Sequence, residues 1–140
     1  MTDFNASVIA DFKANNGRPG GRFENAPVLL LHSTGAKSGE PRLQPLMYQQ
    51  DGDGPWYVFA SYAGSDRNPA WYHNLVANPE VEIEVGDGET ISRILVRAEV
   101  LPEARRAEVY AEQARRFPRF AEYEQKTARP VIPVIALVRR

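Results

Sequence analysis

The sequence predicts an α+β fold in which a small, mostly antiparallel sheet forms a split barrel with helices packed against it. Roughly six segments have the apolar or alternating pattern that is typical of strands. Short turns join the first strand to the second, the second to the third, and the fourth to the fifth, which favours antiparallel pairing. An antiparallel sheet that must bury one face can close into a small barrel.

The chain is expected to begin with a helix and a loop that together occupy residues 1–25. Phe4, Val8, Ile9 and Phe12 recur at helical spacing and predict a helix over residues 4–14. We expect this helix to pack on the body of the protein. The alternatives are a helix that lies over a cofactor pocket or on a membrane surface. The glycine-rich residues 15–25 then predict a loop.

Three strands are expected next, over residues 27–33, 42–50 and 56–62. The first is a continuous apolar run between turn residues. Pro45 lies inside the second strand and indicates a sheet edge or a bulge, because proline cannot donate a hydrogen bond to a neighbouring strand. The tight turn 51–54 predicts that the second and third strands form a hairpin.

A helix is predicted after the third strand, where a short polar loop over residues 63–67 ends at Asn68 and Pro69. Asparagine is a good N-cap and proline is favoured at the first helical position, so this helix should run to about residue 77. Its apolar face should contain Trp71, Leu75 and Val76, with Asn74 on the same side as Trp71.

The last third of the chain predicts two strands, two helices and a final strand. Residues 81–85 alternate strictly and indicate a half-exposed strand, and residues 90–100 return beside it. Helices are expected over residues 102–116 and 119–126, separated by Pro118, and the final strand over residues 131–138.

The composition is that of one soluble globular domain of 140 residues, 1–140. A net charge of −1 argues against nucleic acid as a partner. The absence of cysteine excludes disulfides, thiolate catalysis and iron–sulfur clusters. No apolar run is long enough to span a bilayer and no signal peptide is visible, so we expect a cytoplasmic protein.

Several common catalytic motifs are absent. His32 and His73 are the two histidines, and they form no metal-binding pattern, so no metal is predicted. The spacing of a P-loop fails, and neither GxSxG nor a GxGxxG before a helix is present. These absences argue against a nucleotide-phosphate loop, an esterase and a nicotinamide dinucleotide fold.

The segment 29–46 carries the clearest signal for function. Three leucines lead into a loop with glycine, Ser33, Thr34, Lys37, Ser38 and Arg42. Backbone N–H groups and fixed cations of this kind can bind an anion, so we interpret the loop as a phosphate site. A solvated surface loop is the alternative.

A second group of residues predicts a pocket for a flat ring. Small residues at 61, 63 and 64 precede the helix of Asn68, Trp71 and Asn74, and small residues let a backbone approach a planar ligand closely. Trp71 can stack on a ring, or it can simply fill the core. Phe117, Phe120 and Tyr123 are either core residues or an aromatic wall.

Three segments resemble one known family. LLLHSTGAKSGEPRLQPLMY, ASYAGSDRNPAWYHNLVANPEVEIEV and FAEYEQKTARPVIPVIAL are similar to the deazaflavin-dependent nitroreductases. These are split-barrel oxidoreductases that use coenzyme F420, an 8-hydroxy-5-deazaflavin. The resemblance extends from residue 4 to the end of the chain, and NPAWYHNLVANP together with TGAKSGEPR is its most specific part.

The resemblance implies roles for individual residues. It assigns cofactor binding to Lys37, Ser38, Gly39, Arg42, Pro45, Leu46, Met47, Ser61, Tyr62, Ala63, Gly64, Asn68, Trp71 and Asn74. It assigns the substrate wall to Trp71, Phe117, Phe120 and Tyr123. The implied reaction is hydride transfer from reduced F420 to an electron-poor acceptor such as a quinone, an enone or a nitroaromatic. Tyr123 is the candidate catalytic residue, which either donates the proton or orients the substrate.

Two other functions stay open at this point. An FMN-dependent oxidoreductase of related barrel shape would have a similar ring-and-phosphate layout, and spacing does not separate FMN from F420. A non-catalytic protein that binds a cofactor or a lipophilic molecule belongs to a different class. Neither the oligomeric state nor the physiological acceptor follows from the sequence, and a peripheral membrane contact through the N-terminal helix remains an alternative.

Overall fold

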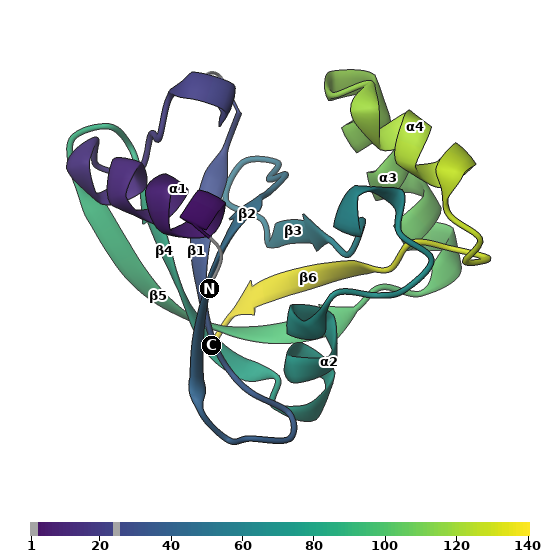
Figure 1. Ribbon diagram of the computed structural model, residues 1–140, viewed down its shortest axis with the longest axis horizontal. Helices are drawn as coiled ribbons and strands as arrows, with labels where there is room; N and C mark the ends of the chain where they lie inside the picture. The colour runs from purple at the N-terminus through teal and green to yellow at the C-terminus, as the bar shows by residue number, and fades with distance from the viewer. Residues whose placement is uncertain (1–2, 24–25) are drawn as a thin grey trace.

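The computed structural model describes residues 3–23 and 26–140 (Figure 1). Residues 1–2 and 24–25 of the predicted N-terminal segment lie outside this part. The strands are β1 Val28–Thr34, β2 Pro41–Met47, β3 Trp56–Phe59, β4 Glu80–Gly86, β5 Ile91–Val100 and β6 Val134–Arg139. The helices are α1 Asp3–Ala14, α2 Ala70–Ala77, α3 Glu103–Arg116 and α4 Arg119–Lys126, with short 3-10 turns η1 Gly21–Phe23 and η2 Tyr62–Gly64.

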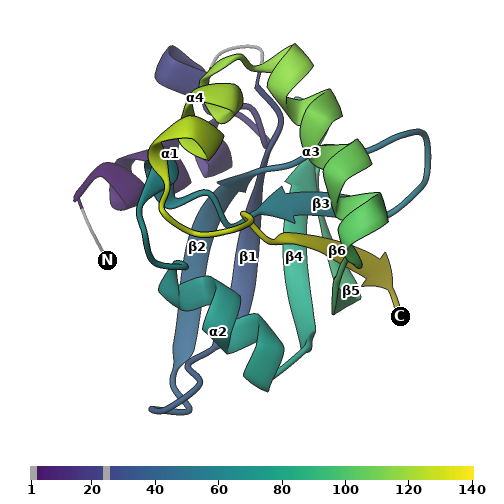
Figure 2. The ribbon, with the colours of Figure 1, turned by 90° about the vertical axis from the view of Figure 1, so that its right-hand side faces the viewer.

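The six strands form one antiparallel sheet in the order β2-β1-β4-β5-β6-β3. The sheet curls strongly, so that β3 and β6 cross the open side of the curve formed by β1, β4 and β5 (Figures 1 and 2). One isolated bridge, Gln49 to Tyr57, joins the two edges of the sheet. The predicted split barrel is therefore confirmed, and in the described part of the chain this bridge links its two edge strands.

The predicted hairpin between the second and third strands is present only as the single antiparallel bridge between Gln49 and Tyr57. β2 pairs with β1 from Val28–Met47 to Thr34–Pro41, whereas β3 pairs along its length with β6. Beyond Met47 the chain passes from β1 to β3: the Tyr48 N–H still donates to the Pro27 carbonyl, and the Gln49 N–H donates to the Tyr57 carbonyl. The side chain of Gln49 is buried and donates to the Val109 carbonyl at 3.1 Å. Pro45 lies in an edge strand, as predicted, where its missing N–H breaks no ladder.

Three apolar clusters hold the layers together. Leu29, Leu31, Ile83, Val96 and Ile135 fill the inside of the barrel. A second cluster packs α3 and α4 on β3 and β6, through residues such as Phe59, Tyr110, Phe120 and Val134. The third packs α1 on β1, where Ile9 and Phe12 meet Val28 and Leu30.

The burial of α1 distinguishes between two predictions for this helix: packing on the body of the protein, and contact with a membrane surface. Val8, Ile9 and Phe12 are 6%, 8% and 0% exposed, so these three side chains of the apolar face are buried, whereas Phe4 is 49% exposed. That burial confirms packing on the body and gives no support to a membrane contact through this face. No helix in the described part of the chain is long and apolar enough to cross a membrane.

Three smaller predictions need correction. Pro69, not Asn68, occupies the N-cap position of α2, and no side chain caps that helix. Val76 is 56% exposed rather than part of the buried face of α2, whereas Trp71, Asn74 and Leu75 are buried. Glu84, expected on the exposed side of β4, is 8% exposed, because its Oε2 lies 2.5 Å from His32 Nε2 on β1.

Candidate functional site

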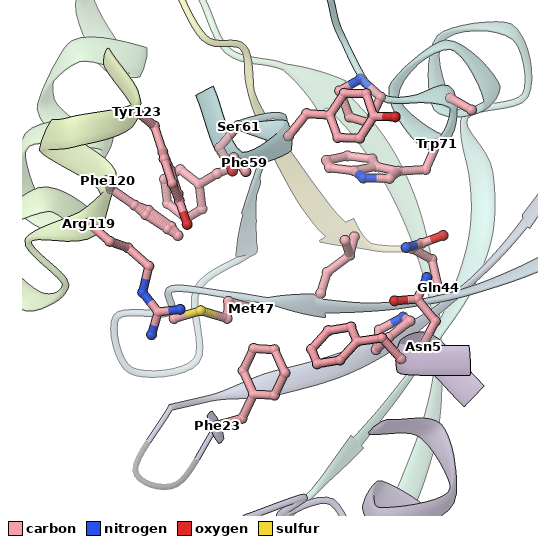
Figure 3. Close-up of a pocket in the computed structure, with 17 residues that line it drawn as sticks. Asn5, Phe23, Gln44, Met47, Phe59, Ser61, Trp71, Arg119, Phe120 and Tyr123 are labelled. Carbon is pink, nitrogen blue, oxygen red and sulfur yellow. The ribbon is translucent and has the colours of Figure 1, made fainter. Parts of the chain in front are cut away.

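A cavity of about 480 Å³ lies between β2, η2, the start of α2 and α4; we call it the aromatic cavity. Nine of the residues predicted from the sequence line it: Pro45, Leu46, Met47, Ser61, Tyr62, Ala63, Trp71, Phe120 and Tyr123. In Figure 3 the α4 residues face Trp71 across the cavity, and Met47 and Gln44 lie along a third side. The curl of the sheet thus brings together segments that lie far apart in the sequence, such as Pro45–Met47 and Phe120–Tyr123.

Packing fixes the aromatic rings of this wall. The Phe120 ring lies 5.7 Å from Phe59 and 5.3 Å from Tyr123, both in edge-to-face contacts. Such pairs contribute about 0.5–1.5 kcal/mol beyond burial and hold each ring in one orientation. Phe120 is 4% exposed, so it supports the wall, while Tyr123 is partly exposed and presents its hydroxyl to the cavity.

The backbone of η2 is held in an unusual conformation beside the cavity. Tyr62 and Ala63 have φ values of 46° and 53°, in the left-handed region that costs non-glycine residues about 1–3 kcal/mol. The Arg129 guanidinium fixes this segment, because it donates to the Ala60 and Ser61 carbonyls, each at 2.8 Å, and to Asn68 Oδ1 at 2.7 Å. Burial lowers the pKa of Arg129 below its ordinary value.

A second cavity of about 530 Å³ lies between the β1–β2 loop and α2; we call it the loop cavity. It is lined by Gly35, Ala36, Lys37, Ser38, Arg42, Ala70, His73 and Asn74. Ala70, at the first turn of α2, lines both cavities, so the two lie next to each other. The aromatic cavity is mostly apolar, and the loop cavity carries the cations Lys37 and Arg42.

Hydrogen bonds give the β1–β2 loop a defined shape. Gly35 N–H donates to the Glu40 carbonyl at 2.8 Å, and Gly39, with φ of 69°, donates to the Gly35 carbonyl at 3.0 Å. Ala36 N–H donates to Asn74 Oδ1 at 2.9 Å and docks the loop on α2. The loop is therefore positioned by the same helix whose first turn borders the aromatic cavity.

The two predicted cations of this loop differ in their surroundings. Arg42 Nη1 lies 3.4 Å from Glu40 Oε2, and its Nη2 donates to Ser38 Oγ at 3.3 Å. Among the described side chains, none pairs with Lys37, which is exposed at the loop cavity. An anion at this position would therefore meet Lys37 as an unneutralised charge.

Four predicted site residues line neither cavity. Gly39 shapes the loop turn, and Asn68 holds Arg129. Gly64 packs against α4, since a Cβ there would lie 3.2 Å from Tyr123 Cα. Phe117 ends α3, with its ring centroid 6.5 Å from that of Phe120. All four adjoin residues of the cavity walls, so any effect they have on a ligand is indirect.

The cavities also contain residues that the sequence analysis did not single out. In the aromatic cavity these are Phe4, Asn5, Phe23, Gln44, Phe59 and Arg119, and in the loop cavity His73 joins the cations. The helical spacing of Arg119, Phe120 and Tyr123 was a usable signal for Arg119, because positions i and i+4 share one face. Among the described residues no group of three His, Cys, Asp or Glu side chains could hold a metal ion.

The chain is similar over most of its length to known proteins. The family model described as F420H(2)-dependent quinone reductase matches residues 6–139. The chain is 44% identical over 137 residues to a protein named F420H(2)-dependent quinone reductase from Mycobacterium tuberculosis (strain ATCC 25618 / H37Rv), covering 94% of this chain and 87% of that protein.

Two solved structures are similar to the chain in both fold and sequence. A structure titled F420-H2 Dependent Reductase (FDR-A) superposes with a TM-score of 0.68 at 35% identity, over 79% of this chain and 93% of that one. Another, titled as a domain-swapped dimer, superposes with a TM-score of 0.68 at 30% identity, over 94% of both chains.

Proposed function

Since the chain belongs to the F420H(2)-dependent quinone reductase family, we propose that its two adjacent cavities hold coenzyme F420 and a quinone side by side. The family makes the protein an oxidoreductase in which hydride passes from reduced F420 to a quinone. The FMN-dependent alternative is not favoured by this assignment. What we propose in addition is the placement of the two ligands and the roles of the residues.

The residues present fit the coenzyme. Its phosphate and acidic tail would take the loop cavity, where Lys37 and Arg42 supply positive charge and Ser38 a hydroxyl. Its flat ring would take the part of the aromatic cavity between the Pro45–Met47 backbone and the 61–64 segment, where the small Ala63 lets the backbone approach. The shared lining residue Ala70 is the observation that carries this placement, because it puts the two cavities side by side, within reach of one elongated ligand.

The bound coenzyme supplies the hydride, and the protein residues position and shield the reactants. Trp71, Phe120 and Tyr123 surround the space left for a quinone, and their rings exclude water from it. Tyr123 can donate a hydrogen bond to a quinone oxygen, which orients the ring. Arg129 keeps Ser61 and its neighbours in place and therefore acts as a positioning residue.

Binding of the coenzyme tests this proposal directly. The purified protein is titrated with oxidised F420, FMN and NADPH, with tryptophan quenching as the signal, because Trp71 lines the cavity. Tight binding of F420 alone is expected, followed by oxidation of reduced F420 when a quinone is added. Enones and nitroaromatics are tested next as further acceptors. Binding without any acceptor-dependent oxidation would indicate a carrier protein, and binding of none would make the loop cavity a surface feature.

A further inference from the structure

Arg119 is a half-buried cation in the wall of the aromatic cavity. It is the first residue of α4, and Tyr123 follows at the i+4 position on the same face of the helix. In Figure 3 its side chain extends from α4 in the direction of Met47, below Phe120 and Tyr123. Of the described residues that line this cavity, Arg119 alone carries a charge.

No acidic partner in the described part of the chain accounts for a cation at this position. Neighbouring arginines have anionic partners: Arg106 pairs with Glu103 at 2.8 Å, and Arg116 pairs with Glu112 at 2.7 Å. No side chain in the described part of the protein hydrogen-bonds to Arg119. A cation in the first turn also opposes the helix dipole, which favours negative charge there. A residue that is unfavourable for its own helix and gains no compensating contact is expected at functional sites.

We propose that Arg119 binds the acceptor oxygen of the quinone and stabilises the negative charge that develops on it during reduction. The inference rests on the proposed placement of the quinone in the aromatic cavity. The quinone gains a hydride, which is two electrons and one proton, and becomes a hydroquinone monoanion while reduced F420 is oxidised by two electrons. A proton from water then converts the anion to the hydroquinone.

The chemistry of the guanidinium suits this role. It stays protonated at working pH, so it supplies charge and N–H donors but transfers no proton. In a cavity walled by aromatic side chains, a charge-assisted hydrogen bond to an oxyanion is stronger than it is in water. Lys37 and Arg42 line the other cavity, so they do not substitute for Arg119.

An anionic probe tests the site without turnover. The probe is 4-nitrophenol, whose phenolate is yellow and forms near neutral pH, so its ionisation is read from absorbance in the bound state. We expect wild-type protein to bind the phenolate more tightly than the phenol. Arg119→Gln should weaken phenolate binding about tenfold to a hundredfold and leave phenol binding unchanged. The matched control is Arg115→Gln, which removes the same charge from an exposed residue paired with Glu112.

The second measurement follows hydride transfer to a series of benzoquinones whose hydroquinones differ in acidity. The loss in kcat/KM for Arg119→Gln should be largest for quinones with the weakest hydroquinone acids, because their oxyanions need the most stabilisation. The melting temperature should be unchanged or raised, since the helix dipole no longer opposes a cation.

The outcomes of these two measurements distinguish the role of Arg119 from the proposed function. Equal phenolate binding and an equal loss across the quinone series would overturn the role of Arg119. Preferential phenolate binding by a wild-type protein that does not oxidise reduced F420 with any quinone would instead contradict the proposed function and leave the anion site intact. A variant with a lowered melting temperature that binds phenol poorly as well would show that Arg119 is structural.

Discussion

Among the residues of the loop cavity, we expect Lys37 to contribute most to binding of the coenzyme phosphate. Its ammonium has no partner among the described side chains, whereas the Arg42 guanidinium already pairs with the Glu40 carboxylate. A charge-assisted hydrogen bond contributes about 1.5–3 kcal/mol, so Lys37→Ala should weaken binding of oxidised F420 about tenfold to a hundredfold. Fluorescence titration measures the dissociation constant, with the exposed Lys13→Ala as the control. An unchanged constant for Lys37→Ala would place the coenzyme phosphate elsewhere.

Tyr123 is expected to orient the quinone rather than to protonate it. A tyrosine hydroxyl is a weak acid at neutral pH, and solvent reaches this partly exposed residue. Tyr123→Phe should therefore raise KM for the quinone about twofold to tenfold, the value of one neutral hydrogen bond, with kcat retained. Steady-state kinetics across pH separate the two roles. A large fall in kcat would show that the phenol donates the proton.

At the residue scale most of the predicted site residues line a cavity. They could be predicted because glycines, cations and aromatic residues are grouped in short segments of the sequence. Nine predicted residues line the aromatic cavity and four line the loop cavity. Arg119 and Arg129 were missed for different reasons. The helical spacing that places Arg119 beside Tyr123 was present but was not used, whereas Arg129 has no local signature, because its role depends on which distant backbone the fold brings near it.

Among the elements, α4 carries the substrate wall and depends on α3 for its position. The buried Tyr110 hydroxyl on α3 donates to the Phe120 carbonyl at 2.7 Å, and burial raises the pKa of this tyrosine well above its ordinary value. Tyr110→Phe leaves a buried carbonyl without its donor, so we expect it to lower the free energy of unfolding by about 1–3 kcal/mol. Urea denaturation of the wild type and the variant measures this difference in the free energy of unfolding.

The control for this change is Tyr57→Phe. The Tyr57 hydroxyl accepts a hydrogen bond from Arg105 at 3.0 Å, but the arginine can turn to water when the hydroxyl is lost. Its effect on stability should therefore be smaller. If Tyr110→Phe shifts α4, KM for the quinone rises as well. Equal stability of the two variants would show that α4 is held by the apolar contacts alone.

Strand and helix bounds were predictable from local patterns, but strand partners were not. Residues 42–50 and 56–62 read as a hairpin because a tight turn separates them. In the structure β3 pairs with β6, about 80 residues away in sequence, since burying Tyr57 and Phe59 against α3 and α4 outweighs the local pairing. The last strand begins at Val134 rather than residue 131, because Pro133 lacks an N–H to donate.

For the molecule as a whole, the contact between α1 and the sheet completes the aromatic cavity. Phe4 and Asn5 line the cavity from α1, and the far end of this helix leads to Gly17 against Gly86 at the end of β4. Gly88 N–H donates to the Asn16 carbonyl at 3.0 Å and anchors the same junction. We therefore propose that residues 1–140 behave as a single domain, in which α1 unfolds together with the sheet.

The substitution Gly86→Ala tests this coupling. A Cβ at Gly86 would lie 2.2 Å from the Asn16 carbonyl oxygen and 2.5 Å from Gly17 Cα, so backbone must move. Overpacking of this kind costs about 1–3 kcal/mol, and we expect an unfolding free energy lowered by that amount. Displacement of α1 should also raise KM for the quinone, while F420 binding at the distant Lys37 changes little.

The matched control is Gly52→Ala, in the turn before β3. Gly52 has φ of 58°, but no atom lies within 4 Å of the position that a Cβ would take, so its substitution introduces backbone strain without a clash. It should lower stability through the left-handed conformation and leave KM unchanged. If Gly86→Ala also leaves KM unchanged while lowering stability, α1 contributes to the fold and not to the substrate wall, and the quinone is enclosed by β2, α2 and α4 alone.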